Sequence, residues 1–171
     1  MKKKYIGPLI VILVIMIGYS SVWIKSYNRA REFYIAAMEN YNSGEITIAL
    51  KGGKVRSNNS EYVYIGGFQQ AYEMFESKYA IPKPKLMDKS EVMINRIIDE
   101  VTIEEGKEIF QSNFGIDNRY LPDILIRIGD LYYEQEQYDK SEETYQMVVD
   151  AFSRYEEQAR IAQEKLKKFD E

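Results

Sequence analysis

The sequence predicts an all-α protein in which one membrane-spanning helix is followed by a short solenoid of helical hairpins. Two observations lead to this fold class. First, the twenty residues from Tyr5 to Ile24 contain no charge, and a helix needs about 20 apolar residues to cross a bilayer. Second, apolar residues recur every three or four positions through most of the remaining chain, which is the period of one helix face.

Composition narrows the range of functions. The 171 residues are 45% hydrophobic and 29% charged, which suits a folded core and not a disordered chain. Cysteine and histidine are both absent from the sequence, so disulfides, thiolate nucleophiles, imidazole bases and the usual zinc ligands are excluded. The Gly-Gly pairs at 52–53 and 66–67 lack the spacing of a phosphate-binding loop. We therefore expect a protein that is not an enzyme and that holds neither a metal nor a cofactor.

The charge distribution argues against nucleic acid as a partner. The formal net charge is −4, and three positive charges, Lys2–Lys4, lie before the apolar run, whereas no acidic residue precedes Glu32. The rest of the chain is therefore more acidic than the whole, and an acidic surface repels phosphate.

Residues 1–24 are predicted to be a cytoplasmic lysine stub and a transmembrane signal-anchor helix. Lys2–Lys4 favour a cytoplasmic N-terminus and an extracytoplasmic body, although basic residues after the run weaken this signal. Tyr5 and Trp23 stand at the two ends of the run, where aromatic residues often meet lipid headgroups.

A cleaved signal peptide is the alternative interpretation of this segment. Gly18-Tyr19-Ser20 has the small-x-small form of a cleavage site. Because the apolar run continues through Val22–Ile24, we favour a retained anchor.

The clearest helical hairpin is predicted in residues 121–155. Pro122 suits a first helical turn, where its missing N–H needs no partner. The polar break at Gln135–Asp139 is so short that the two helices must lie antiparallel. Gly129 costs roughly 1 kcal/mol against Ala inside a helix, which indicates that a neighbouring backbone comes close there. Four residues of each helix share one face: Leu125, Ile128, Gly129 and Tyr132 in the first, and Ser141, Tyr145, Val148 and Phe152 in the second.

Residues 25–51 are predicted to form a first hairpin that is continuous with the anchor. Its first helix runs on from Lys25 and ends at Asn42-Ser43-Gly44, a common C-terminal stop. Its second helix is cut short by Gly52-Gly53.

Residues 52–87 are interpreted as an insertion. Gly, Ser and Asn make residues 52–60 a predicted loop. An amphipathic helix is predicted from Glu61 to Tyr79, although its first turns, YVYIGG, also suit a short strand. Residues 80–86 contain two prolines one residue apart, which exclude a helix.

Residues 88–120 are predicted to form another hairpin, with helices at Asp88–Val101 and Ile103–Phe114. Residues 110–120 align with residues 145–155 at an offset of 35, which indicates that the two segments belong to copies of one unit.

The final stretch, residues 156–171, is predicted to be a polar helix that caps the array. Ala159, Ala162, Leu166 and Phe169 lie on its inward face. A terminal repeat needs a polar outer face, and this helix supplies one.

The spacing in residues 121–155 resembles the tetratricopeptide repeat, a 34-residue helix–turn–helix unit. Gly129 falls at its eighth position and Tyr145 at its twenty-fourth. Two departures stand out, because Ser141 replaces the usual Ala and Glu136 stands where a turn Gly is common. The stretch RIGDLYYEQEQYDKSEETYQMVV looks most like the repeats of bacterial cell-envelope proteins of the outer-membrane-assembly and Tol–Pal-coordination type. On this resemblance, residues 25–51 and 88–120 are degenerate units of the same kind.

In this family the first helix of each unit lines a concave binding face. The resemblance implies a protein-binding role for eight residues: Tyr34, Met38 and Tyr41 in the first unit, and Asp123, Ile126, Asp130, Tyr133 and Glu134 in the clear unit. Tyrosine and methionine ringed by carboxylates suit a peptide or helix with basic and apolar residues. The alternative is that these side chains are simply exposed to solvent.

The expected function is that of a single-pass, non-catalytic scaffold or accessory subunit. We expect it to bind partner proteins, in a multi-subunit membrane complex, on the extracytoplasmic side of a bacterial inner membrane. Three alternatives remain: a soluble periplasmic adaptor released by signal peptidase, a self-assembling scaffold, and a catalytic or ligand-binding protein that uses the insertion at 52–87.

Overall fold

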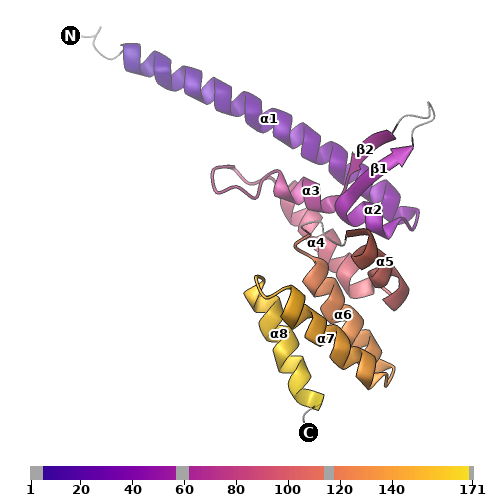
Figure 1. Ribbon diagram of the computed structural model, residues 1–171. Coiled ribbons are helices and arrows are strands. Elements are labelled where there is room, and N and C mark those ends of the chain that lie inside the picture. The colour runs from indigo at the N-terminus through magenta and orange to yellow at the C-terminus, as the bar shows by residue number, and fades with distance from the viewer. Residues whose placement is uncertain (1–5, 57–61, 114–117, 170–171) are drawn as a thin grey trace. The chain divides into compact units, whose positions relative to one another are not determined.

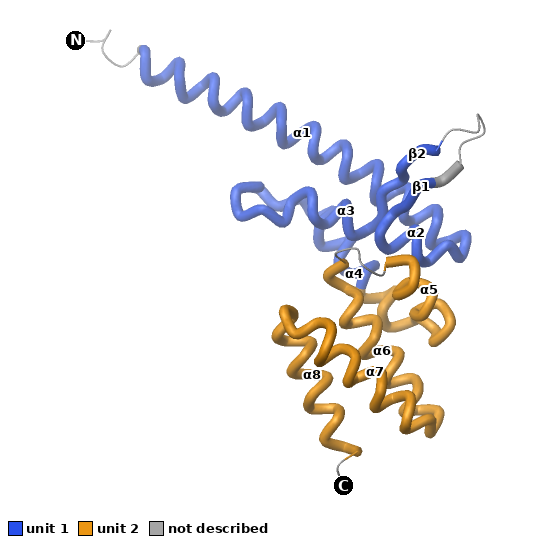
Figure 2. The backbone as a smooth tube through the Cα atoms, in the orientation of Figure 1, with its two compact units in different colours: residues 1–94 blue, residues 95–171 orange. Residues whose placement is uncertain are grey.

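The computed structural model describes residues 6–56, 62–113 and 118–169, and these are mostly helical, as predicted (Figure 1). The chain divides into two compact units, unit 1 with residues 1–94 and unit 2 with residues 95–171 (Figure 2). Each unit has its own core.

Unit 1 is built on one continuous helix, α1 (Ile6–Asn42). The predicted continuation from the apolar run and the predicted end are both confirmed. The chain reverses at Gly44, whose φ of 82° lies in the left-handed region that glycine favours, and α2 (Ile46–Lys51) follows. Ala30 and Ala37 are fully buried on α1, which packs against α2 and α3. Their small side chains let these elements come close to α1.

A β-hairpin follows α2, and it corrects the all-helical prediction. β1 (Gly52–Arg56) pairs antiparallel with β2 (Tyr62–Gly66), from Gly52 opposite Gly66 to Arg56 opposite Tyr62. The loop predicted at 52–60 and the helix predicted from Glu61 are wrong for the described part, residues 52–56 and 62–66. The alternative prediction of a short strand at YVYIGG is confirmed.

The glycine pairs lie at the base of this hairpin instead of at its turn. A Cβ on Gly67 would lie 2.4 Å from the Gly52 nitrogen, and one on Gly66 would lie 2.1 Å from the Phe33 ring. No side chain fits in these gaps, so glycine is required for the close approach of β1, β2 and α1.

α3 (Phe68–Glu73) is shorter than the helix predicted to end at Tyr79. Phe68, Ala71 and Phe75, which share one face of the predicted amphipathic helix, are buried, whereas Tyr79 on the same face is exposed. The chain turns after Glu73, and the Lys83 ammonium donates to the carbonyls of Phe75 and Ser77 within this turn.

α4 (Lys85–Glu100) begins three residues before the predicted start at Asp88. Pro82 and Pro84 keep the preceding segment non-helical, and the helix starts immediately after Pro84. The predicted loop at 80–86 is therefore correct through Pro84 only.

Unit 2 contains the remaining helices, close to their predicted bounds: α5 (Ile103–Asn113), α6 (Leu121–Glu134), α7 (Tyr138–Ala151), α8 (Glu156–Leu166) and a short 3-10 helix, η2 (Lys167–Phe169). Phe114, the predicted end of α5, lies outside the described residues. A capping box starts α5: the Thr102 N–H donates to Glu105 at 2.9 Å, and the Glu105 N–H donates to the Thr102 hydroxyl at 3.2 Å.

α6 and α7 form the predicted antiparallel hairpin, and Gly129 is the point of closest approach. A Cβ at Gly129 would lie 2.4 Å from Cε1 of Tyr145. The Ser141 hydroxyl donates to the Gly129 carbonyl at 2.8 Å. The predicted close contact is thus in the right place, but a ring and a hydroxyl make it instead of a backbone. In the turn, Glu136 has a φ of 59°, the left-handed geometry that a turn glycine would adopt more easily.

α8 packs against α6 and α7, as the predicted capping helix should. Ala159 and Ala162 are buried on its inner face, and Leu166 and Phe169 are half-buried. The last turn tightens into η2, so the α-helix itself ends three residues before Phe169.

Candidate functional site

The eight residues predicted to bind a partner fall into two sets that belong to different units. Tyr34, Met38 and Tyr41 lie on α1 in unit 1, and all three are half-buried. The Tyr34 ring packs edge-on against Phe68 of α3, with ring centroids 5.4 Å apart. Tyr34 therefore contributes to the core of unit 1.

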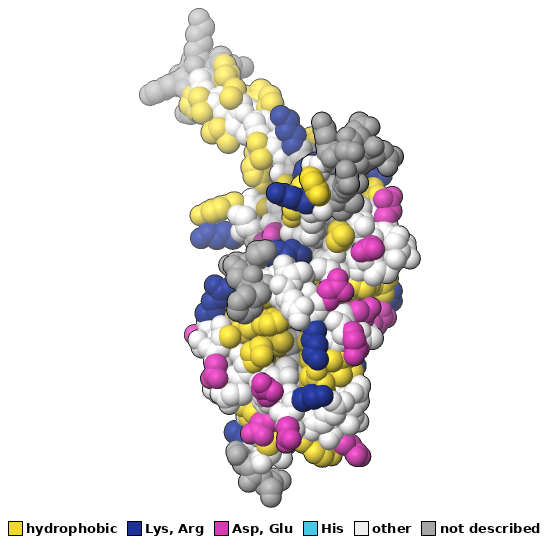
Figure 3. Space-filling model, turned by 45° about the vertical axis from the view of Figure 1, so that its right-hand side comes forward, with side chains coloured by type: hydrophobic (Ala, Val, Ile, Leu, Met, Phe, Trp, Pro, Cys, Tyr) yellow, Lys and Arg dark blue, Asp and Glu magenta, His cyan; other side chains and the backbone are white. Residues whose placement is uncertain are grey.

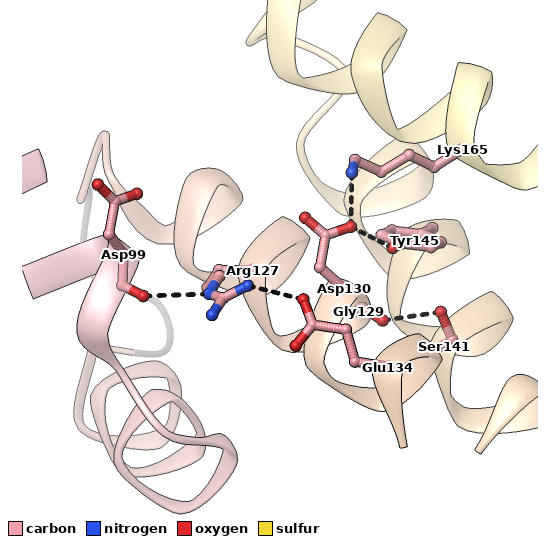
Figure 4. A network of polar contacts seen from close by, with 8 residues as sticks. All are labelled: Asp99, Arg127, Gly129, Asp130, Glu134, Ser141, Tyr145 and Lys165. Atoms are coloured by element: carbon pink, nitrogen blue, oxygen red, sulfur yellow. Dashed lines mark hydrogen bonds and ion pairs between the residues drawn. The ribbon is translucent and has the colours of Figure 1, made fainter. Parts of the chain in front are cut away.

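The other five predicted residues lie on α6 in unit 2, and Asp130 is the centre of a polar network there (Figure 4). The Tyr145 hydroxyl donates to Asp130 Oδ1 at 2.5 Å, and the Lys165 ammonium lies 2.5 Å from the same oxygen. The Asp130 and Lys165 side chains are only 30% and 25% exposed. Asp130 thus ties α6 to α7 and α8, and burial together with its hydrogen bond raises the pKa of Tyr145.

Asp123 makes a similar contact within the first turn of α6. Gln158 of α8 donates to Asp123 Oδ1 at 3.1 Å. Burial raises the pKa of the Asp123 carboxyl, and the Gln158 hydrogen bond and Arg119 offset this rise in part. The charged carboxylate is therefore held at a cost in stability.

The last three predicted residues of α6 are also in contact with their neighbours. Ile126 is buried. Tyr133 is 37% exposed, and its ring packs edge-on against Tyr138 and Phe169 at centroid distances of 5.2 and 5.8 Å. Glu134 accepts from Arg127 at 3.2 Å, and Arg127 also donates to the Asp99 carbonyl (Figure 4).

The predicted α6 face thus exists as a row on one helix, but α8 covers much of it. Asp123 and Asp130 each meet a residue of α8 that lies 35 positions later in the chain. These contacts use the polar atoms that the resemblance assigned to a partner.

A groove of about 290 Å³ lies elsewhere in unit 2, between α5, α6 and α7. Leu125, Ile128 and Tyr132 of α6 form its apolar floor with Met147 of α7. Sequence reasoning placed the α6 residues in the core and did not identify the groove. The helical spacing of these residues in the sequence shows that they share one face of α6. It does not show that part of this face borders a groove.

Two lysines stand over the aromatic part of this floor. The ammonium groups of Lys107 and Lys140 lie 5.3 and 5.6 Å from the centroid of the Tyr132 ring. Glu143 adds a carboxylate to the lining. An apolar floor under two cations suits a segment with apolar side chains and a nearby carboxylate.

Among residues 6–56, 62–113 and 118–169, no three acidic side chains gather where they could hold a metal ion.

Comparison of the chain with models of known protein families, with curated proteins and with solved structures found no match. By length and composition α1 qualifies as a candidate membrane span, a test that an N-terminal signal sequence also passes.

Because burial raises the pKa of Asp123, we expect Asp123→Asn to increase stability at pH 7. The folded state binds the Asp123 proton more tightly than the unfolded state does. This preference adds its full amount to the free energy of unfolding below the unfolded pKa, and the added stability is lost as the pH rises through the raised folded pKa. The neutral amide avoids that loss and still accepts from Gln158. The gain over wild type should disappear near pH 3, as measured by denaturant unfolding at both pH values.

Asp139→Asn is the matched control, because Asp139 is an exposed aspartate in the first turn of α7. The helix dipole favours the charge there as it does at Asp123, but no burial opposes it, so this change should lower stability by about 0.5 kcal/mol at pH 7. A wild-type protein more stable than Asp123→Asn at pH 7 would contradict the proposed cost of burial.

Proposed function

We propose that this chain is a membrane-anchored, non-catalytic scaffold or accessory subunit that holds a partner protein close to a membrane. The observation that carries the proposal is that α1 has two parts with different surroundings. Its first part exposes large apolar side chains, and Leu9, Val14 and Ile17 are each more than half exposed (Figure 3). Its second part packs into unit 1 through Ala30 and Ala37. So long an exposed apolar surface needs a bilayer around it.

The contacts of Tyr19 support a retained anchor over a released adaptor. The Tyr19 hydroxyl lies within hydrogen-bond distance of the carbonyls of Tyr79 and Ile81, at 2.8 and 2.7 Å. Cleavage at Gly18-Tyr19-Ser20 would remove this residue and its contacts. Lys2–Lys4 before the apolar run support a cytoplasmic N-terminus, with the chain that follows the span on the other side.

The repeat character of the body is supported by α6, α7 and α8. The sequence spacing that resembles a tetratricopeptide unit falls on the α6–α7 hairpin, where Gly129 meets Tyr145 and α8 packs against both helices. The placement in a bacterial inner membrane and the role in a multi-subunit complex rest on the resemblance to envelope proteins.

The groove between α5, α6 and α7 is the best candidate for the partner site. It combines apolar floor residues with Lys107 and Lys140, and no other described residue of unit 2 fills it. The α6 face that the resemblance indicated is in contact with α8, so we place binding at the groove first. The chain then acts by binding and not by chemistry.

Purification of the full-length chain from its native membrane in a mild detergent tests this proposal. We expect membrane proteins to be retained in stoichiometric amounts. The Lys107→Glu/Lys140→Glu variant should lose them, whereas Lys89→Glu/Lys167→Glu, with the same change in charge at exposed positions, should keep them.

Three outcomes would count against parts of the proposal. Recovery of the chain alone would overturn the scaffold function. Equal retention by both double variants would place the partner away from the groove. An intact mass that shows the loss of the first 20 or so residues would overturn the anchor and support a released adaptor.

A further inference from the structure

The segment between α3 and α4 lies directly against the apolar part of α1. The Tyr19 hydroxyl accepts from the Ile81 N–H at 2.8 Å, in addition to its contacts with the carbonyls of Tyr79 and Ile81. The Trp23 indole N–H donates to the Pro82 carbonyl at 3.0 Å. These bonds fasten the backbone of residues 79–82, which we call the interfacial loop, to α1.

The attachment lies at the level of the last apolar turns of α1. Tyr19 and Trp23 belong to the uncharged run, which ends at Ile24. With a helical rise of 1.5 Å per residue, Tyr19 lies about 9 Å before Lys25, the first charge after the run. The interfacial loop therefore runs beside the last turns of the apolar segment and not beside the charged residues that follow.

The loop presents apolar side chains at this level. Tyr79 is 73% exposed and Ile81 is 66% exposed, although the backbone between them is held by the Tyr19 hydroxyl, which accepts from the Ile81 N–H and donates to one of the two nearby carbonyls. A cleft of about 200 Å³, lined in part by Trp23, Met74 and Phe75, lies beside these bonds, between α1 and residues 74–80. Exposed apolar side chains on a backbone that is held in place are typical of a surface that binds a membrane or another protein.

The charges around the loop fit a lipid headgroup region. Lys78, Lys83 and Lys85 flank the loop, and no acidic residue lies between Glu76 and Asp88. This local excess of positive charge contrasts with the net charge of −4 for the whole chain. Tyrosine and lysine beside an apolar tip are the side chains that favour a membrane interface with anionic lipid.

We propose that the interfacial loop is a second membrane contact, which inserts Tyr79 and Ile81 into the headgroup–acyl boundary of the leaflet next to unit 1. The proposal rests on the proposed function, because it requires α1 to span the bilayer. Two contacts, the span and the loop, hold unit 1 in one orientation about the axis of α1. Unit 1 then presents the same side to the membrane at all times.

Site-directed spin labelling of the full chain in vesicles of phosphatidylcholine and phosphatidylglycerol, three to one, tests the loop. The chain has no native cysteine, so Tyr79→Cys and Ile81→Cys each give a single labelling site. Both side chains are mostly exposed, and both replacements keep the backbone hydrogen bonds to α1. Ile12→Cys reports on the span, and Glu142→Cys, at an exposed charged position, reports on water.

Relaxation of each label by oxygen and by a water-soluble nickel complex measures its depth. We expect the label at Ile12→Cys to be reached by oxygen and not by nickel, and the label at Glu142→Cys to be reached by nickel. Both loop labels should fall between these two, with an oxygen-to-nickel ratio several-fold above that of Glu142→Cys.

The same data separate the two ways in which the idea can fail. If Ile12→Cys is protected while both loop labels are as open to nickel as Glu142→Cys, the span stands and the interfacial loop is overturned. If Ile12→Cys is itself open to nickel, the membrane anchor is wrong and the loop proposal falls with it.

Discussion

Gly67→Ala should destabilise unit 1 by about 3 kcal/mol or more and disorder the β-hairpin. The added Cβ would lie 2.4 Å from the Gly52 nitrogen and 2.7 Å from the carbonyl carbon of Leu50. These are backbone atoms at the junction of α2 and β1, so no side-chain rotation relieves the clash. Hydrogen exchange followed by mass spectrometry should show faster exchange in peptides from residues 45–75.

Gly53→Ala is the matched control for this prediction, because it lies in the same hairpin. Its added Cβ would meet Ile48 at 3.8 Å, an ordinary contact. We expect a change within about 0.5 kcal/mol and wild-type exchange. Equal stability of the two variants would show that β1, β2 and the end of α2 do not pack as described.

Gly129→Ala should destabilise unit 2 by about 1–3 kcal/mol, even though alanine is the better helix former. The new methyl would lie within 3 Å of three atoms of the Tyr145 ring. That ring has little room to move. Its hydroxyl donates a hydrogen bond to Asp130, and the centroid of the Phe169 ring lies 6.3 Å from its own centroid. Denaturant unfolding and the exchange of peptides from α6 and α7 measure the loss.

Two further variants test the cause of this loss. Gly106→Ala places its methyl 2.7 Å from Cδ1 of Ile128, the flexible end of a side chain, so its cost should be clearly smaller. In a Tyr145→Leu background, Gly129→Ala should become neutral or slightly stabilising, because the ring is gone. If the loss persists in that background, contact with the ring is not its cause.

The helices that were predicted correctly are those whose ends are marked by residues only a few positions away in the sequence. Pro122 marks the start of α6, and Gly44 marks the end of α1 through its positive φ. The helical spacing of apolar residues is enough to identify α6, α7 and α8. These signals are local because helix hydrogen bonds join residues four apart.

The hairpin and the end of α3 were not predicted, because both depend on distant parts of the chain. Gly52 pairs with Gly66 across the two strands. In the sequence these glycines indicate turns, but in the structure they allow the strands to pack closely at the base of the hairpin. Tyr79 continues the apolar spacing of α3, but the chain turns after Glu73 and the next segment is fastened to Tyr19, 60 positions earlier.

The candidate site divides in the same way. The sequence alone determined a chain that pairs an apolar N-terminal helix with a helical body, and it indicated which helix, α6, carries the row from Asp123 to Glu134. Only the tertiary structure decided that Gln158 and Lys165 of α8 bind that row and that the open groove lies over Tyr132. The reason is physical: periodicity shows which residues share a face, but what covers a face depends on the packing of elements far apart in the chain.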